Sequence, residues 1–415
     1  MRALDREFAY RDVARAVGVW RNTSEGMHMS KYRRRLPQLS GRPFLTDGGL
    51  ETTFIFHNGI ELPYFASFDL LKSASGTKAI REYYERYIAI AKRNRIGFVL
   101  EGATWRASPD WGAKLGYSRA QLTEANCAAV SLMADLRDEH ESAQTPIVIS
   151  ANIGPRGDGY KIDNAMSIAE AEDYHGWQVG IFRDTEADLI SAFTINYAEE
   201  GIGVARACRA AGMPSVISFT VETDGKLPSG QTIRDAIEQT DRETNNAPAY
   251  YMLNCAHPTH FADALRRGEP WVTRLRGLRA NASTRSHAEL DAAADLDIGD
   301  PADLGRRYRD LCRQFGHFAV LGGCCGTDHR HIEQISLASV PIEGGVRLDN
   351  ATLPDTVYYC ARCKTQNFPV GIDAADSWIA GDEDVRGTVR SRAERPLNES
   401  SSIRWIAVLR IRSSS

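Results

Sequence analysis

The sequence predicts an α/β protein whose main part is a closed (β/α)8 barrel, a TIM barrel. Three observations support this fold class. Short apolar runs rich in β-branched residues alternate with longer amphipathic stretches from Phe44 onward, which is typical of βα units around a parallel sheet. Eight such units occur before residue 340, the number that closes this kind of barrel. Asp47-Gly48-Gly49 follows the first run and does not match the G-x-G-x-x-G loop of an open dinucleotide-binding sheet.

The expected strands and helices alternate along most of the chain. We expect strands at 44–47, 97–104, 146–152, 187–194, 215–221, 249–254, 277–281 and 318–322. We expect helices at 78–95, 118–138, 167–182, 200–211, 232–240, 302–315 and 328–337. Several of the helical stretches open with Ser, Thr or Asp, whose side chains cap the free N–H groups of a first helical turn.

Three segments are expected along the chain. Residues 1–42 form an N-terminal extension, because they are rich in basic residues and show little apolar periodicity. Residues 43–340 form the barrel. Residues 341–415 form an irregular C-terminal extension with little capacity to build a core, since acidic, arginine-rich and serine-rich stretches follow one another there.

Composition and charge argue against several classes of partner. The 415 residues are 43% hydrophobic and 25% charged, with a formal net charge of -4, so neither nucleic acid nor an anionic membrane surface is an expected partner. We find neither an apolar stretch of the roughly 20 residues that a membrane helix needs nor the apolar core of a signal peptide. We therefore expect a cytoplasmic protein, and the sequence leaves its oligomeric state open.

The strongest local motif is Gly322-Gly323-Cys324-Cys325-Gly326-Thr327, directly after an apolar run. The glycines permit backbone angles that other residues resist, so both thiols of the Cys324-Cys325 pair can turn toward one ion. Eight cysteines are too few for a disulfide-built scaffold in a chain of this length, so clustered cysteines favour a metal or catalytic role.

A second cysteine motif, Asn254-Cys255, also follows an expected strand. If these strands are the sixth and eighth of a barrel, Cys255, Cys324 and Cys325 lie together at its C-terminal rim, where barrel active sites are built. Soft thiolate ligands select Zn²⁺, and three protein ligands leave a fourth tetrahedral position open. The sequence therefore predicts a catalytic zinc site that can activate a substrate thiol.

Other interpretations of the cysteines stay open at this point. A single buried cysteine is often a small apolar filler, and Cys127, Cys208 and Cys312 fall in helical patterns that favour core packing. Cys360 and Cys363 have the spacing of half a zinc knuckle, but no second pair lies nearby. A redox or metal protein that uses vicinal thiols without any transfer chemistry is the competing class.

The segment from about Phe44 to Leu337 resembles the homocysteine S-methyltransferases. The resemblance rests on Asp47-Gly48-Gly49, Asn254-Cys255 and the Gly322–Thr327 motif, with Gly154–Tyr160 as support. It implies a zinc-dependent barrel in which the sulfur of homocysteine attacks an activated methyl group and gives methionine.

The resemblance also implies roles for individual residues. Cys255, Cys324 and Cys325 fall on the zinc ligands of the family, and Asp47 falls on the carboxylate that binds the amino group of homocysteine. A second amino-binding glutamate of the family is replaced by Phe193 in this sequence. Glu101, at the end of the second expected strand, is a candidate to replace that carboxylate. The departure at Phe193 leaves room for another thiol or selenol acceptor.

The expected partners are small molecules, a thiol acceptor and a methyl donor. S-methylmethionine, S-adenosylmethionine and betaine are all candidate donors, and the sequence does not choose among them. A folate and cobalamin route is disfavoured, because the segment after the barrel is too short for additional domains. Trp105, Trp111 and Tyr160 are candidates to face a cationic donor through their rings, although packing under a loop explains each equally well.

Overall fold

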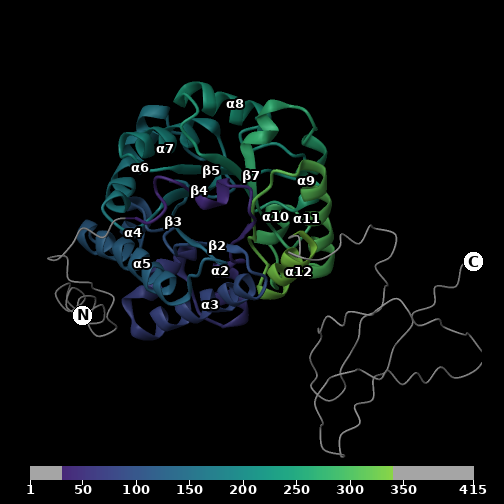
Figure 1. Ribbon diagram of the computed structural model, residues 1–415. Coiled ribbons are helices and arrows are strands. Elements are labelled where there is room, and N and C mark those ends of the chain that lie inside the picture. The colour runs from purple at the N-terminus through teal and green to yellow at the C-terminus, as the bar shows by residue number, and fades with distance from the viewer. Residues whose placement is uncertain (1–29, 340–415) are drawn as a thin grey trace, which may run out of the picture. The chain divides into compact units, whose positions relative to one another are not determined.

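The computed structural model describes residues 30–339, and its eight strands form a closed barrel in the order β1 to β8 (Figure 1). All neighbouring strands pair in parallel, and β8 closes the ring against β1. The strands are β1 (Phe44–Leu45), β2 (Gly97–Glu101), β3 (Ile147–Ile153), β4 (Leu189–Ile195), β5 (Ser215–Phe219), β6 (Tyr250–Asn254), β7 (Leu275–Ala280) and β8 (Val320–Gly323). Each overlaps an expected strand, so the predicted fold class is confirmed.

The helices form an outer layer around the barrel (Figure 1). The seven expected helices are all present, as α3 (Ala74–Arg93), α5 (Arg119–His140), α6 (Ile168–Arg183), α7 (Ala198–Ala210), α8 (Ile233–Thr244), α11 (Pro301–Phe315) and α12 (His329–Ser339). Side chains of Ser118 and Ser167 cap α5 and α6, and each forms a capping box.

Several short helices were not expected from the sequence. They are α2 (Leu50–Thr52), α4 (Pro109–Lys114), α9 (Pro258–Phe261) and α10 (His287–Asp291), with short 3-10 or π turns at η1 (Pro37–Leu39), η2 (Thr53–His57), η3 (Pro63–Phe65), η4 (Ser67–Lys72), η5 (Ala262–Ala264) and η6 (Pro270–Arg274). The connection from β6 to β7 contains only the short elements α9, η5 and η6. Elements this short show too few residues for a helical period to stand out.

The strands are mainly apolar because both of their faces are covered. Every residue of β2, β3, β4, β5 and β6 is buried, as expected of a parallel sheet with helices outside and a packed interior. One cluster of side chains fills the interior, and its members include Phe44, Val99, Leu189, Val216 and Met252. The barrel is therefore a solid support for the loops at its C-terminal rim.

Residues 30–42, part of the predicted N-terminal extension, pack against the N-terminal end of the barrel. Asp188, at the entry to β4, is fully buried and accepts hydrogen bonds from the backbone N–H of Tyr32 at 2.7 Å and of Ile149 at 2.9 Å. Arg137 of α5 donates to the same carboxylate at 3.0 Å. The remainder of that extension and the predicted C-terminal extension lie outside the described residues, so the predicted boundaries stay predictions.

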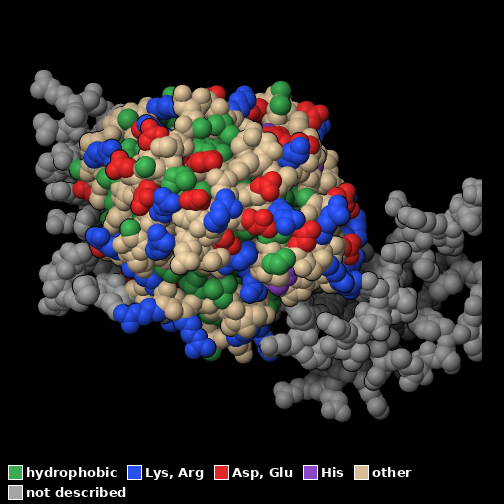
Figure 2. Space-filling view, turned by 90° about the horizontal axis from the view of Figure 1, so that it is seen from above, with side chains coloured by type: hydrophobic (Ala, Val, Ile, Leu, Met, Phe, Trp, Pro, Cys, Tyr) green, Lys and Arg blue, Asp and Glu red, His purple; other side chains and the backbone are tan. Residues whose placement is uncertain are grey.

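The surface carries both signs of charge. Acidic and basic side chains are interspersed over the face shown in Figure 2, with hydrophobic side chains in small groups between them. Within residues 30–339, none of the helices has the length and apolar character needed to cross a membrane.

Candidate metal and substrate site

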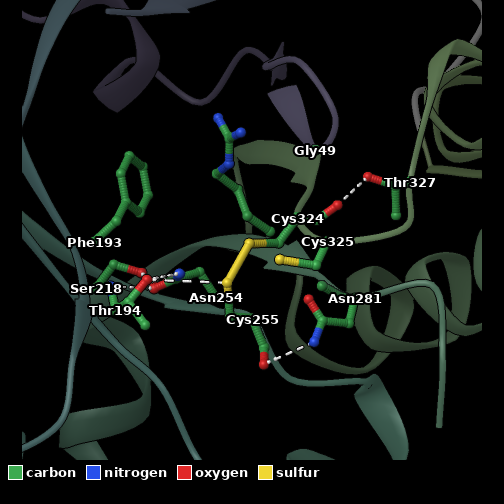
Figure 3. Close-up of a disulfide and its surroundings, with 12 residues drawn as sticks. Gly49, Phe193, Thr194, Ser218, Asn254, Cys255, Asn281, Cys324, Cys325 and Thr327 are labelled. Atoms are coloured by element: carbon green, nitrogen blue, oxygen red, sulfur yellow. Dashed lines mark hydrogen bonds between the residues drawn. A yellow bond between two sulfur atoms is a disulfide. The ribbon is translucent and has the colours of Figure 1, made fainter. Parts of the chain in front are cut away.

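Cys255, Cys324 and Cys325 come together at the C-terminal rim of the barrel (Figure 3). Cys255 follows β6 and the other two follow β8, so the strand between them, β7, separates the two loops in the ring. The three Sγ atoms all lie within 4.8 Å of one another. The sequence reasoning thus found the three residues that the fold brings together, although Cys255 lies 69 positions before Cys324 in the chain.

Two of the three sulfurs are joined. Cys255 and Cys324 form a disulfide with a Cα–Cα distance of 5.4 Å, and the Cys325 side chain points toward it (Figure 3). The sequence argument expected metal binding and not a bridge. Reduction of this disulfide would give three neighbouring thiols, the soft donor set that suits Zn²⁺. The residues present therefore fit a zinc ion in the reduced protein.

The backbone around Cys255 is held in an unusual conformation. Cys255 has a φ of 54°, in the left-handed region that non-glycine residues rarely adopt. Its N–H donates to the Arg279 carbonyl at 3.1 Å, and its own carbonyl accepts from Asn281 Nδ2 at 3.0 Å and from His287 Nε2. These contacts on both sides of the residue fix the direction of its thiol.

Asn254 braces the same loop from inside the barrel. Its Oδ1 accepts hydrogen bonds from the Thr194 backbone N–H at 2.9 Å and from Ser218 Oγ at 2.7 Å (Figure 3). Its Nδ2 donates to Thr194 Oγ1 at 2.9 Å, and that hydroxyl lies 3.9 Å from Cys255 Sγ. The asparagine that precedes the cysteine in the motif therefore links β4, β5 and β6 beneath the thiol.

The loop that carries Cys324 and Cys325 packs closely against the turn after β1. The Gly323 N–H donates to the Asp47 carbonyl at 2.9 Å. A Cβ at Gly49 would lie 2.5 Å from the Cys324 carbonyl oxygen, closer than real Cβ atoms approach. Thr327 Oγ1 donates to the same carbonyl at 2.7 Å. The glycines of both predicted motifs are thus required by close backbone packing.

Asp47 lies in this turn beside the cysteine loop, but its carboxylate is already occupied. Arg279 Nη1 donates to Oδ1 at 2.7 Å, and Tyr83 Oη donates to Oδ2 at 2.9 Å. Although burial works against it, the charges of Asp47 and Glu101 hold the pKa of Arg279 above its usual value. The sequence reasoning did not single out Arg279. β7 holds two arginines, Arg276 and Arg279, and nothing in the sequence distinguishes the second from the first.

Glu101 is 3% exposed at the end of β2, and its Oε2 has no hydrogen-bond partner among the described residues. Burial raises the pKa of this carboxyl to about 8, although the charge of Arg279 and the hydroxyl of Ser150 oppose the shift. Glu101 is therefore mainly protonated near neutral pH. Phe193 lies at the edge of the same region, with its ring centroid 5.1 Å from Cζ of Arg279.

The raised pKa of Glu101 predicts a pH-dependent stability. Between its ordinary value of 4.5 and about 8, the folded state keeps a proton that the unfolded state has released. The contribution of the protonated Glu101 carboxyl to the free energy of unfolding is thus fully present below about pH 4.5. It is lost as the pH rises, by about 1.4 kcal/mol per pH unit. Urea unfolding of the natural protein and of Glu101→Gln should show a stability difference that shifts toward the variant between about pH 5 and about pH 8. A constant difference would contradict the buried, protonated carboxyl.

The aromatic candidates are arranged differently from the expectation. The guanidinium of Arg106 lies 3.9 Å from the ring centroids of both Trp105 and Trp111. Lys114 Nζ lies 3.8 Å from the Trp111 centroid as well. Protein cations already contact these two indoles, so neither is positioned as a free platform for a cationic donor.

Tyr160 is the aromatic candidate that reaches the cysteines. Its hydroxyl lies 3.9 Å from Cys325 Sγ, and its ring stacks on His287 with a centroid distance of 3.9 Å. Burial, together with the nearby Cys325, raises the pKa of Tyr160 well above its usual value, so it remains a neutral phenol. His287 Nδ1 in turn lies 3.0 Å from Glu222 Oε1. His287 and Glu222 were not anticipated from the sequence.

Comparisons with known proteins agree with this architecture. A family model described as homocysteine S-methyltransferase matches residues 44–339. The oxidized form of the homocysteine methyltransferase MmuM from Escherichia coli is 20% identical, with a TM-score of 0.59, over 74% of this chain and 99% of that one. Its metallated form is 18% identical, with a TM-score of 0.56, over 71% and 96% of the two chains. These structures share the fold of the chain.

Proposed function

Since the chain belongs to the homocysteine S-methyltransferase family and is therefore a methyltransferase, we propose that it transfers a methyl group to the thiol of homocysteine with the help of a zinc ion held by Cys255, Cys324 and Cys325. The single observation that carries the zinc proposal is the convergence of three sulfurs from two separate loops within 4.8 Å. The metallated form of the E. coli methyltransferase supports it.

The metal would supply one kind of chemistry. A Zn²⁺ ion at the three cysteines would favour the deprotonated, nucleophilic form of an acceptor thiol at neutral pH. The residues of the chain keep the ligands in place, since the contacts of Asn254, Asn281 and Gly323 fix the two loops that carry the sulfurs. Such supporting contacts set how well a metal site is preorganised.

The transfer itself is a displacement at the methyl carbon. The acceptor sulfur forms a new S–CH3 bond with its own electron pair, while the bond from the methyl carbon to the donor breaks. That second pair stays on the donor, which leaves as a neutral thioether or tertiary amine. The acceptor thiol proton is released. S-methylmethionine, S-adenosylmethionine and betaine all satisfy this balance, and alignment of the two partners in the barrel mouth supplies much of the rate.

We propose that Asp47 and Glu101 are the carboxyl groups of the acceptor site. The buried and unpartnered Oε2 of Glu101 supports a direct contact with the substrate. Asp47, which shares both of its oxygens with Arg279 and Tyr83, supports the site through those partners. We also propose that the protein works in the cytoplasm, because a reducing compartment keeps cysteines available to a metal.

The proposal is tested by methyl transfer in the reduced, zinc-loaded protein. The full chain would be reduced with a phosphine, loaded with Zn²⁺ and incubated with each of the three donors and with homocysteine whose carbon chain carries ¹³C. We expect labelled methionine with at least one donor, and its loss after treatment with a chelator. Absence of labelled methionine with all three donors would contradict the proposed reaction.

The disulfide between Cys255 and Cys324 favours one alternative function, a thiol redox protein. The E. coli relative also has an oxidized form, which agrees with this alternative. A redox protein would cycle between thiol and disulfide without any metal. Thiol titration after removal of zinc would then show that the cysteines are still oxidised and reduced reversibly. A methyltransferase, by contrast, loses methyl transfer when the zinc is removed.

A further inference from the structure

Arg279 reaches across the barrel mouth from β7 to the turn after β1. Its Nη1 donates to Thr46 Oγ1 and to Asp47 Oδ1, each at 2.7 Å, and its Nη2 donates to the Gly48 carbonyl at 3.1 Å. A guanidinium carries five N–H donors. Among the described residues its Nε has no hydrogen-bond partner, so part of the donor fork is free to bind another group.

Both members of the Arg279–Asp47 pair are buried, and the cation is the more exposed of the two. The Arg279 side chain keeps 9% of its exposure, whereas Asp47 keeps 2% and accepts bonds from Arg279 and Tyr83. A guanidinium with unused donors matches the planar, bidentate geometry of a carboxylate.

The groups around this pair offer little negative charge to an ammonium. The charge of Asp47 is balanced by Arg279. Burial raises the pKa of both nearby glutamates, Glu101 and Glu51, and Glu51 Oε1 already accepts a hydrogen bond from Ser67 Oγ at 2.9 Å. Phe193 presents a ring to the guanidinium, 5.1 Å from its Cζ. The mouth thus favours an anionic group on the acceptor over a cationic one.

We propose that Arg279 is the specificity-determining residue of the acceptor site and binds a carboxylate of the thiol substrate, while Asp47 positions the guanidinium. The proposal rests on the proposed function. It defines the acceptors as thiols that carry a carboxylate a few bonds from sulfur, a class that includes homocysteine but does not require its amino group. An Arg279 that only neutralises Asp47 would give no such preference.

Two analogues of homocysteine separate these roles in the natural protein. 4-Sulfanylbutanoate keeps the carboxylate and lacks the ammonium, whereas 3-aminopropane-1-thiol keeps the ammonium and lacks the carboxylate. Calorimetric titration of each thiol into the reduced, zinc-loaded chain needs no methyl donor. We expect 4-sulfanylbutanoate to bind within about tenfold of homocysteine and 3-aminopropane-1-thiol to bind about 100-fold more weakly, as for a site that loses a buried charged partner.

Variants then assign the preference to one side chain. Arg279→Met should bring homocysteine and 3-aminopropane-1-thiol within about tenfold of each other, and Arg279→Lys should restore part of the preference. Because Arg279→Met leaves Asp47 buried without its cation, the double variant with Asp47→Asn removes both charges together. Arg276→Met, on the same strand but half-buried and bonded to the His317 carbonyl, is the matched control and should keep the natural ranking.

The outcomes distinguish the two proposals. Tight binding of 3-aminopropane-1-thiol to the natural protein, or an unchanged ranking in Arg279→Met, would overturn the role of Arg279. If the thiols bind in the expected order but no donor gives labelled methionine, the proposed reaction fails while the carboxylate preference stands. If none of the three thiols binds, both proposals fall.

Discussion

Replacing Cys255 with alanine is expected to remove both bound zinc and methyl transfer. The three sulfurs lie within 4.8 Å of one another, and loss of one leaves two donors, too few for a protein zinc site. Loss of the metal should lower the rate on the order of 10³-fold or more, because metal catalysis contributes several kcal/mol. Zinc content measured by mass spectrometry and methionine formation with the best donor check the two effects.

Cys127→Ser is the matched control for this substitution. Cys127 lies half-buried on α5, outside the three-sulfur cluster, and is not bridged. The Cys127→Ser variant should keep its zinc and most of its methyl-transfer activity. If Cys255→Ala still held one zinc ion per chain, the metal site would have to be built from other residues.

Replacing Arg137 with methionine is expected to lower the free energy of unfolding by about 3 to 5 kcal/mol, because it leaves a charged group buried without its partner. Arg137 is 4% exposed and donates to the fully buried Asp188 at 3.0 Å. The same carboxylate holds the backbone of Tyr32 and of Ile149, so the variant should also loosen residues 30–42. Urea unfolding, together with hydrogen exchange of those residues, measures both effects.

An exposed pair from the same region provides the control. Arg183 and Asp184 lie 2.8 Å apart at the end of α6, and both are more than half exposed. Arg183→Met should change the stability by at most about 0.5 kcal/mol, since exposed ion pairs contribute little. If the two variants lost the same free energy of unfolding, burial of the Arg137–Asp188 pair would not increase its contribution to stability.

Local pattern was sufficient to predict the barrel and its strands. The strands are buried and mainly apolar because helices cover one face and packed side chains fill the other, so their composition shows that they are buried. The helices at 118–138 and 167–182 were found because serine caps precede amphipathic stretches. Short elements such as α10 were missed because they span barely more than one helical turn.

The cysteine cluster was also within reach of the sequence. Glycines around Cys324 and Cys325, and the end of a strand before Cys255, placed all three at one rim once eight βα units were counted. The sequence did not predict the pairing of Cys255 with Cys324, since the direction of each thiol depends on the left-handed backbone of Cys255 and on contacts from β7 and the residues that follow it.

The sequence by itself determined the fold class, the family resemblance and the identity of the three clustered cysteines, because these depend on composition and on short motifs. Only the tertiary structure decided what faces the substrate. Nothing in the sequence marks Arg279 as a site residue, yet its guanidinium reaches Asp47 and occupies one oxygen of that carboxylate. Residues 30–42 likewise join the barrel through Asp188. Long-range charge pairs of this kind leave no periodic trace in the chain, since they depend on which strands close the ring.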